Sequence, residues 1–316
     1  MTLIGVGRVL LPAGLDQLEE RGAVRVGGLD ADRDRVLEVV AGVDAVVADP
    51  TVRVDAELLD AAGPQLRVVA NFAVGFDNVD LDECGRRGVI VTNTPDVLTN
   101  ATAELALALT LGAARLLGEA ERDLRAGRWL GWDPAAYRGL ELSGSTVGVV
   151  GLGRIGGRYA ELLSGFEVEL LYTARSRKQD RERELGAGWV ELEELLERSD
   201  VVSVHAPAAP DTTHLIDAAA VARMKSSAVL VNTSRGSLVD LAAVAAALRE
   251  GRLGAAGLDV YEGEPQVPEE ILAAPRTLLA PHIGSATVKS RDAMARTVAA
   301  NVIAVLDGGE PPNRVV

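Results

Sequence analysis

The chain has 316 residues, 48% of them hydrophobic and 25% charged, a composition typical of a soluble globular protein with room for two domains. No apolar run reaches the roughly 18 residues that a membrane span needs, and a net charge of −14 argues against nucleic acid or an anionic membrane as partner. The single cysteine, Cys84, excludes an internal disulfide. With an N-terminus unlike a signal peptide, it predicts a cytoplasmic location.

The first part of the chain alternates short apolar runs with helical patterns. Four valine-rich runs are strand candidates: 24–26, 45–48, 66–70 and 89–92. Helical spacing lies between them at 32–40 and 55–62, and the segment before Val24 also scans as a strand followed by a helix. Alternating strands and helices with nearly continuous apolar strands predict a parallel sheet covered on both faces.

A long apolar helix is expected next, from about Ala101 to Ala126, with Thr99 as its N-cap and Gly127 at its end. It leads into an irregular stretch, Trp129–Pro134, that holds two of the three tryptophans.

From Ser145 the strand–helix rhythm restarts. Six strands are predicted, at 145–150, 168–173, 200–205, 228–233, 255–260 and 277–281, and the clearest helix between them is 241–250. Six strands suffice for a dinucleotide-binding domain, so a last helix at 287–306 is expected to return to the first domain. We therefore predict two Rossmann-like or flavodoxin-like doubly wound domains. Residues 98–286 form the dinucleotide-binding domain, inserted into a substrate domain of residues 1–97 plus 287–316.

The clearest motif of the chain follows the strand at 145–150. There the sequence reads Gly151-Leu152-Gly153-Arg154-Ile155-Gly156 and continues with helical spacing. In a dinucleotide site the first glycine permits a tight turn, the second lets the backbone approach a pyrophosphate, and the third lets helix and strand pack closely. The alternative is a plain strand–helix turn.

The end of the next strand bears on the choice of cofactor. An Asp or Glu usually stands there to bond the adenosine ribose of NAD, but here the run is Tyr172-Thr173-Ala174-Arg175-Ser176-Arg177-Lys178. Arg175, Ser176 and Arg177 could instead bind a 2′-phosphate, so the sequence favours NADP(H), with NAD(H) possible. The alternative is a solvated basic helix start.

Three polar residues lie at or after the ends of later strands: Arg235, Glu264 and His282. Reduction of a 2-oxo acid needs a cation for the carboxylate, a proton donor for the carbonyl oxygen and a hydride. Arg235 can supply the first and protonated His282 the second, while Glu264 beside His282 would favour the imidazolium. Taken singly, each could be structural.

Several segments match one family in order and spacing, from about Val24 to Pro312. They are Asn71-Phe72-Ala73-Val74-Gly75-Phe76-Asp77-Asn78, Thr92-Asn93-Thr94-Pro95-Asp96-Val97-Leu98-Thr99, the glycine loop, Asn232-Thr233-Ser234-Arg235-Gly236, Gly257-Leu258-Asp259-Val260, Glu264-Pro265 and Pro281-His282-Ile283-Gly284-Ser285-Ala286. With them the chain resembles the D-2-hydroxyacid dehydrogenase family, most closely its glyoxylate/hydroxypyruvate reductase branch.

The resemblance implies catalytic roles for Arg235, Glu264 and His282, and substrate binding by the backbone amides of Val74 and Gly75. It implies cofactor contacts by Asp259 on the nicotinamide carboxamide and by the glycine loop. Further cofactor contacts are implied at Thr102, His205, Ala206, Pro207, Thr233, His282 and Gly284. It implies a homodimer in which Trp132 reaches the neighbouring subunit's active site; the alternative is a residue that packs in the dimer without contacting substrate. No metal is expected.

The resulting expectation is an NADPH-preferring reductase that converts glyoxylate, hydroxypyruvate and similar 2-oxo acids to D-2-hydroxy acids. Other D-2-hydroxyacid dehydrogenases remain open, above all phosphite dehydrogenase, which shares the Arg/Glu/His set. A nicotinamide-sensing corepressor on the same fold is the non-enzymatic alternative. Asp133 departs from the family, where relatives often have His between the Trp and the Pro.

Overall fold

The computed structural model describes residues 2–316, which fold as two compact units. Unit 1 runs to Leu98 and resumes at Ser285, and unit 2 is Thr99–Gly284. Both are sheets of parallel strands with helices on each face, so the predicted fold class is confirmed.

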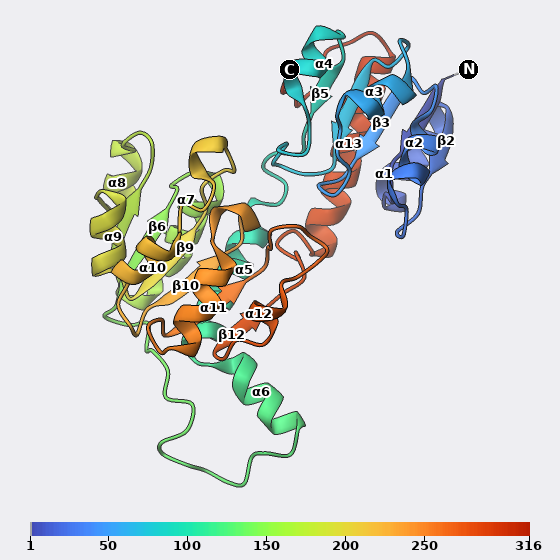
Figure 1. Cartoon of the computed structure of the whole chain (residues 1–316). Helices are drawn as coiled ribbons and strands as arrows, with labels where there is room; N and C mark the ends of the chain where they lie inside the picture. The colour runs from blue at the N-terminus through green and yellow to red at the C-terminus, as the bar shows by residue number, and fades with distance from the viewer. Residues whose placement is uncertain (1) are drawn as a thin grey trace. The chain divides into compact units, whose positions relative to one another are not determined.

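Unit 1 contains a five-stranded parallel sheet in the order β2-β1-β3-β4-β5 (Figure 1). Its strands are β1 (Leu3–Val6), β2 (Ala23–Val26), β3 (Ala45–Ala48), β4 (Val68–Asn71) and β5 (Ile90–Thr92). This is the flavodoxin-like order. The C-terminal residues extend its edge, because Val91 N donates to Val316 O and Val315 N donates to Val91 O.

Alternate residues of these strands feed two separate cores, as the two-residue period of a strand requires. Val46 and Val69 face the helices α2 (Arg33–Val40), α3 (Ala56–Ala62) and α4 (Leu81–Arg86). On the other face Ala45 and Val68 pack against α1 (Pro12–Arg21) and α13 (Val288–Leu306). The last helix of the chain thus covers one face of the first sheet.

Unit 2 contains a seven-stranded parallel sheet in the order β12-β11-β10-β9-β6-β7-β8. The strands are β6 (Thr146–Val150), β7 (Glu169–Thr173), β8 (Gly188–Trp189), β9 (Val201–Val204), β10 (Val229–Asn232), β11 (Ala255–Leu258) and β12 (Thr277–Leu279). The connection reverses at β6, which is the Rossmann arrangement. The two-residue edge strand β8 is additional to the six strands predicted.

Helices cover both faces of this sheet. One face packs against α5 (Thr99–Ala114) and α7 (Arg154–Leu162), and the other against α9 (Leu192–Arg198), α10 (Ala218–Arg223), α11 (Leu241–Arg249) and α12 (Glu269–Leu272). The remaining elements are α6 (Leu117–Arg125), α8 (Gln179–Leu185) and the 3-10 turns η1 (Leu163–Phe166), η2 (Pro210–Thr212) and η3 (Gly236–Leu238).

The single long helix predicted at 101–126 is wrong. The structure has two helices, α5 and α6, which meet at an angle of 67°. Leu116 breaks the helix because its φ of 53° is left-handed. Thr99 is the first residue of α5 rather than its N-cap. Neither Arg115 nor Leu116, the residues at the break, is a proline or a glycine. The apolar spacing of the two helices therefore predicts one continuous helix.

After α6 the chain runs out as an irregular arm, residues 126–145, before it enters β6 (Figure 1). Leu130 on the arm is 98% exposed and Trp132 is 86% exposed. In the part of the chain that the structure describes, no single helix is long and apolar enough to cross a membrane. Taken together, the bent pair α5 and α6 has the length and apolar composition of a membrane span, but by length and composition only.

Candidate active site

The glycine loop connects β6 to α7 with the geometry of a dinucleotide turn. Gly151 has a φ of +99°, and a Cβ there would lie 2.7 Å from Ala206 N. A Cβ on Gly156 would lie 2.1 Å from Gly151 O, whereas one on Gly153 would meet no atom within 4 Å. Gly151 and Gly156 are therefore required for packing. Gly153 leaves the start of α7 open, where a phosphate can meet backbone N–H groups.

A network of polar side chains around His205 packs against the glycine turn. His205 follows β9, and its Nε2 lies 2.8 Å from Ser203 Oγ; its ring centroid is 5.1 Å from that of Tyr159. Tyr159 OH lies 2.8 Å from Thr110 Oγ1 on α5. Burial lowers the pKa of His205 to about 3, so this imidazole is neutral and cannot serve as the acid of the reaction.

The basic run after β7 is exposed and engaged with acidic partners. Arg175 Nη2 lies 3.0 Å from Asp211 Oδ1, and Arg177 binds both carboxylate oxygens of Glu182 at 2.7 and 2.9 Å. No acid stands at the end of β7 itself, where Ala174 follows Thr173. An anion would compete with Asp211 for Arg175, and that ion pair is weak because both side chains are about two-thirds exposed.

His282 and Glu264 form a hydrogen-bonded pair. His282 Nδ1 lies 2.6 Å from Glu264 Oε2, and since the carboxylate only accepts, Nδ1 carries the proton. Glu264 Oε1 accepts from Tyr261 N at 2.8 Å. Burial raises the pKa of Glu264, but the hydrogen bonds from His282 and Tyr261 outweigh burial and hold this pKa below the ordinary value of a glutamate. Among the residues described, none hydrogen-bonds His282 Nε2, which can therefore face a substrate.

Arg235 belongs to the same cluster. It follows β10, and its carbonyl accepts from Asn232 Nδ2 at 2.8 Å. At Gly236 a Cβ would lie 1.9 Å from the carbonyl carbon of Tyr261, so only glycine lets the Arg235 loop press against the Glu264 loop. The charge of Arg235 also helps to lower the pKa of Glu264. The fold thus brings Arg235, Glu264 and His282 together from three loops.

Asp259 fixes the segment that follows His282. Its side chain is fully buried, and its two oxygens accept from Ile283 N at 2.7 Å and Gly284 N at 2.8 Å. These bonds support the left-handed backbone of His282, whose φ is 53°. Burial raises the pKa of Asp259, against the lowering effect of the two backbone N–H groups. Thr102 lies beside Gly284, within 3.4 Å of a Cβ placed there.

A nicotinamide cofactor fits the residues of unit 2. The glycine loop leaves backbone open at Gly153, and Thr233 Oγ1 after β10 is buried without a hydrogen-bond partner within the described chain. The predicted cofactor residues Ala206 and Pro207 lie in the same loop region, where Ala206 O accepts from Ser234 Oγ at 2.5 Å. An orphaned hydroxyl beside a strand end is what a polar cofactor group would satisfy.

The predicted substrate residues Val74 and Gly75 lie in unit 1, in the loop after β4. Side chains of that unit bind carbonyl oxygens of the loop: Asn93 Nδ2 lies 2.8 Å from Val74 O, and Asn71 Nδ2 lies 2.8 Å from Gly75 O. Neither asparagine was singled out from the sequence, since only the final geometry shows what an amide side chain bonds.

Trp132 does not join the cluster of unit 2 but stands on the exposed arm. Asp133 has a local role, because its carboxylate accepts from Ala135 N at 2.8 Å and so caps a turn of the arm.

His214, outside the predicted site, pairs with Glu262 at 2.9 Å, and this bond raises the pKa of His214. No group of three metal-ligating side chains occurs in residues 2–316.

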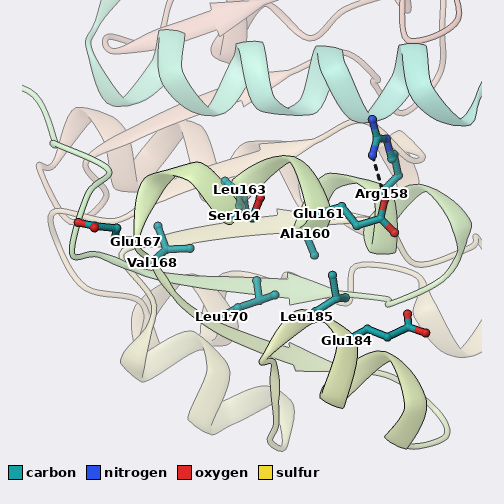
Figure 2. A pocket seen from close by; sticks show the side chains of 10 residues that line it. All are labelled: Arg158, Ala160, Glu161, Leu163, Ser164, Glu167, Val168, Leu170, Glu184 and Leu185. Atoms are coloured by element: carbon teal, nitrogen blue, oxygen red, sulfur yellow. Dashed lines mark hydrogen bonds and ion pairs between the residues drawn. The ribbon is translucent and has the colours of Figure 1, made fainter.

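A surface pocket of about 550 Å³ lies elsewhere in unit 2, over α7, β7 and α8. Figure 2 shows apolar Leu163, Leu170 and Leu185 around it, and the ion pair of Arg158 with Glu161 at 2.9 Å. None of the predicted site residues lines it. Its size therefore carries no weight for the chemistry.

The inserted Rossmann sheet, its glycine loop and the Arg–Glu–His cluster define a nicotinamide-dependent dehydrogenase fold. The family model "D-isomer specific 2-hydroxyacid dehydrogenase, NAD binding domain" matches residues 107–284. The chain belongs to the D-isomer specific 2-hydroxyacid dehydrogenase family, and the predicted resemblance is confirmed.

Named relatives and solved structures are similar to this chain over nearly its whole length. The glyoxylate reductase of Thermococcus litoralis is 47% identical over 287 residues, which is 90% of this chain and 86% of that protein. A crystal structure of a Thermus thermophilus protein matches with a TM-score of 0.92 at 43% identity, covering all of both chains. The NADPH-dependent glyoxylate/hydroxypyruvate reductase of Sinorhizobium meliloti, solved with NADP and malonate, has a TM-score of 0.86 at 35% identity, covering 100% of this chain and 97% of that one.

Proposed function

We propose that this protein reduces small 2-oxo acids such as glyoxylate and hydroxypyruvate to D-2-hydroxy acids. One observation carries the proposal: His282 is bonded through Nδ1 to Glu264, which leaves Nε2 to give a proton, in the cluster that includes Arg235. The names of the relatives support the substrate class.

Each residue of the cluster has a role in this reaction. Arg235 binds the substrate carboxylate, and the backbone amides of Val74 and Gly75 add hydrogen bonds to it. His282 Nε2 donates its proton to the oxygen of the C2 carbonyl, and Glu264 stabilises the charged imidazolium that precedes this step. Asp259 keeps His282 in position through the backbone that follows it.

The nicotinamide cofactor, when bound, supplies the hydride for C2. The residues proposed to hold it are the glycine loop 151–156, Thr102, His205, Ala206, Pro207, Thr233, Asp259, His282 and Gly284, with Arg175, Ser176 and Arg177 for the adenosine end. The missing acid after β7 supports a preference for NADPH over NADH, because nothing at that strand end repels a 2′-phosphate.

A homodimer formed through the arm is also part of the proposal. Besides Leu130 and Trp132, the arm exposes 59% of Trp129, and α6 exposes Leu117 and Leu124. Such a cluster of large apolar side chains supports burial against a second copy. The substrate role of unit 1 and the cytoplasmic location stay predictions.

The test is oxidation of NADPH and NADH with a panel of 2-oxo acids, with phosphite as substrate in the opposite direction. We expect turnover of about 1 s⁻¹ or more with glyoxylate and NADPH, an ordinary value for an enzyme. Turnover of phosphite instead would identify a phosphite dehydrogenase. Cofactor binding without turnover of any panel member would identify a sensor protein.

A further inference from the structure

The loop after β4, residues 72–78, is here named the carboxylate loop. Three successive peptide carbonyls in it accept hydrogen bonds from within unit 1. The donors are Thr94 N to Ala73 O at 2.9 Å, Asn93 Nδ2 to Val74 O at 2.8 Å and Asn71 Nδ2 to Gly75 O at 2.8 Å. The backbone of this loop is therefore held from its carbonyl side.

The planarity of the trans peptide carries this constraint over to the N–H groups. In a trans peptide the C=O of one residue and the N–H of the next point in opposite directions. The held carbonyls of Ala73, Val74 and Gly75 thus direct the N–H groups of Val74, Gly75 and Phe76 away from their donors. Within residues 2–316 none of these three N–H groups makes a hydrogen bond.

The two asparagines are themselves fixed. Asn93 is bonded at both backbone groups, from its N–H to Asn313 O at 3.2 Å and from Asn301 Nδ2 to its carbonyl at 3.1 Å. Asn71 is fully buried and exchanges two side-chain hydrogen bonds with Asn78, each 3.1 Å long. Both side chains can therefore hold the carboxylate loop without first being ordered by a ligand.

We propose that Asn93 and Asn71 are positioning residues, which aim the amides of the carboxylate loop at the substrate carboxylate. Asn93 sets the N–H of Gly75 through the carbonyl of Val74, and Asn71 sets the N–H of Phe76 through the carbonyl of Gly75. The ligand that we assign to these amides is a carboxylate anion, because its two oxygens can accept hydrogen bonds from two neighbouring N–H groups at once. The inference rests on the proposed function and assigns its specificity for acids to two side chains that never touch the substrate.

The experiment compares Asn93→Ala with wild type in steady-state kinetics, with oxalate as a probe of anion binding to the NADPH-loaded enzyme. We expect the KM for glyoxylate and the Kd for oxalate to rise about tenfold, the worth of one well-placed hydrogen bond. The KM for NADPH should change less than about twofold, since the hydrogen bonds of Asn93 within the described chain go to residues of unit 1. Asn71→Ala should show the same pattern.

Gln65→Ala is the matched control. It also removes an amide side chain of unit 1 that donates to a backbone carbonyl, Ala62 O at 2.6 Å, but this side chain bonds neither asparagine nor the carboxylate loop. The proposal is overturned if Asn93→Ala and Gln65→Ala change the glyoxylate KM equally, or if Asn93→Ala alters the NADPH KM as much as the glyoxylate KM. If the alanine variant does not fold, the smaller change Asn93→Ser decides by the same ratios.

Failure of the proposed function gives a different result. A wild-type protein that does not reduce glyoxylate refutes that substrate. The oxalate affinities of wild type and Asn93→Ala, measured by calorimetry, still decide whether Asn93 orients an anion site. If both proteins bind oxalate equally well, the positioning role of Asn93 is rejected.

Discussion

At the scale of single residues, the pairing of Glu264 with His282 has a consequence for pH dependence. The hydrogen bonds from His282 and Tyr261 hold the pKa of Glu264 below the ordinary value of a glutamate, so this carboxylate loses its charge only as the pH falls through that lowered pKa. While it is charged, its Oε2 lies 2.6 Å from His282 Nδ1 and stabilises a positive charge on the ring that donates the proton.

Glu264→Gln keeps the shape of the side chain and removes its charge. We expect kcat/KM for glyoxylate to fall about tenfold in the neutral range, because the proton-donating ring loses the carboxylate that lies 2.6 Å from its Nδ1. The measurement is kcat/KM over the range from acidic to mildly alkaline pH, where the variant and wild type should converge as Glu264 loses its charge at low pH. A loss of less than about twofold at neutral pH would show that the charge of Glu264 does not support proton donation.

Arg175 is the residue on which cofactor preference should depend. Its exposed ion pair with Asp211 contributes little, so a 2′-phosphate can displace it. Arg175→Ala is expected to raise the KM for NADPH about tenfold or more and to leave the KM for NADH nearly unchanged. Arg183→Ala, an exposed arginine of α8, is the control. Equal effects of Arg175→Ala on both cofactors would contradict a phosphate contact.

At the scale of elements, the glycine loop separates packing from ligand binding. Gly156→Ala places a Cβ 2.1 Å from Gly151 O, and we expect it to destabilise unit 2 by about 1–3 kcal/mol. Gly153→Ala meets no atom and has an ordinary φ of −82°, so the fold should keep its Tm. The same change should raise the cofactor KM, because the methyl group covers the backbone that a pyrophosphate approaches.

Thermal unfolding and cofactor KM of the two glycine variants check this division. Loss of Tm in Gly153→Ala, or normal stability in Gly156→Ala, would show that the turn is built differently.

The sequence predicted most elements because their signals are local. The parallel strands are short valine-rich runs, and the glycine loop and the three loops with Arg235, Glu264 and His282 carry residues of distinctive chemistry. The break at Leu116 was missed because a left-handed leucine leaves no trace in an apolar pattern. The roles of Asn71 and Asn93 were missed for another reason: an amide side chain bonds whatever the fold brings to it.

At the scale of the whole molecule, the exposed arm predicts self-association. Replacing Trp129 and Leu130 together by Ser should convert the proposed dimer to a monomer in analytical ultracentrifugation, since both side chains are well exposed in a single chain. Leu29→Ser, at a residue 72% exposed in unit 1, is the matched control and should leave the mass unchanged. A wild-type monomer would reject the arm as an interface.

The placement of α13 has a consequence for how the protein is made on the ribosome. All strands of unit 2 have been synthesised once residue 279 is added, whereas the apolar face of the first sheet waits for Ala295, Val298 and Val302. In a nascent chain this face is therefore covered only by α1 while some 200 further residues are translated. The domain that begins first finishes last, and until α13 is made part of its apolar sheet face is open to aggregation.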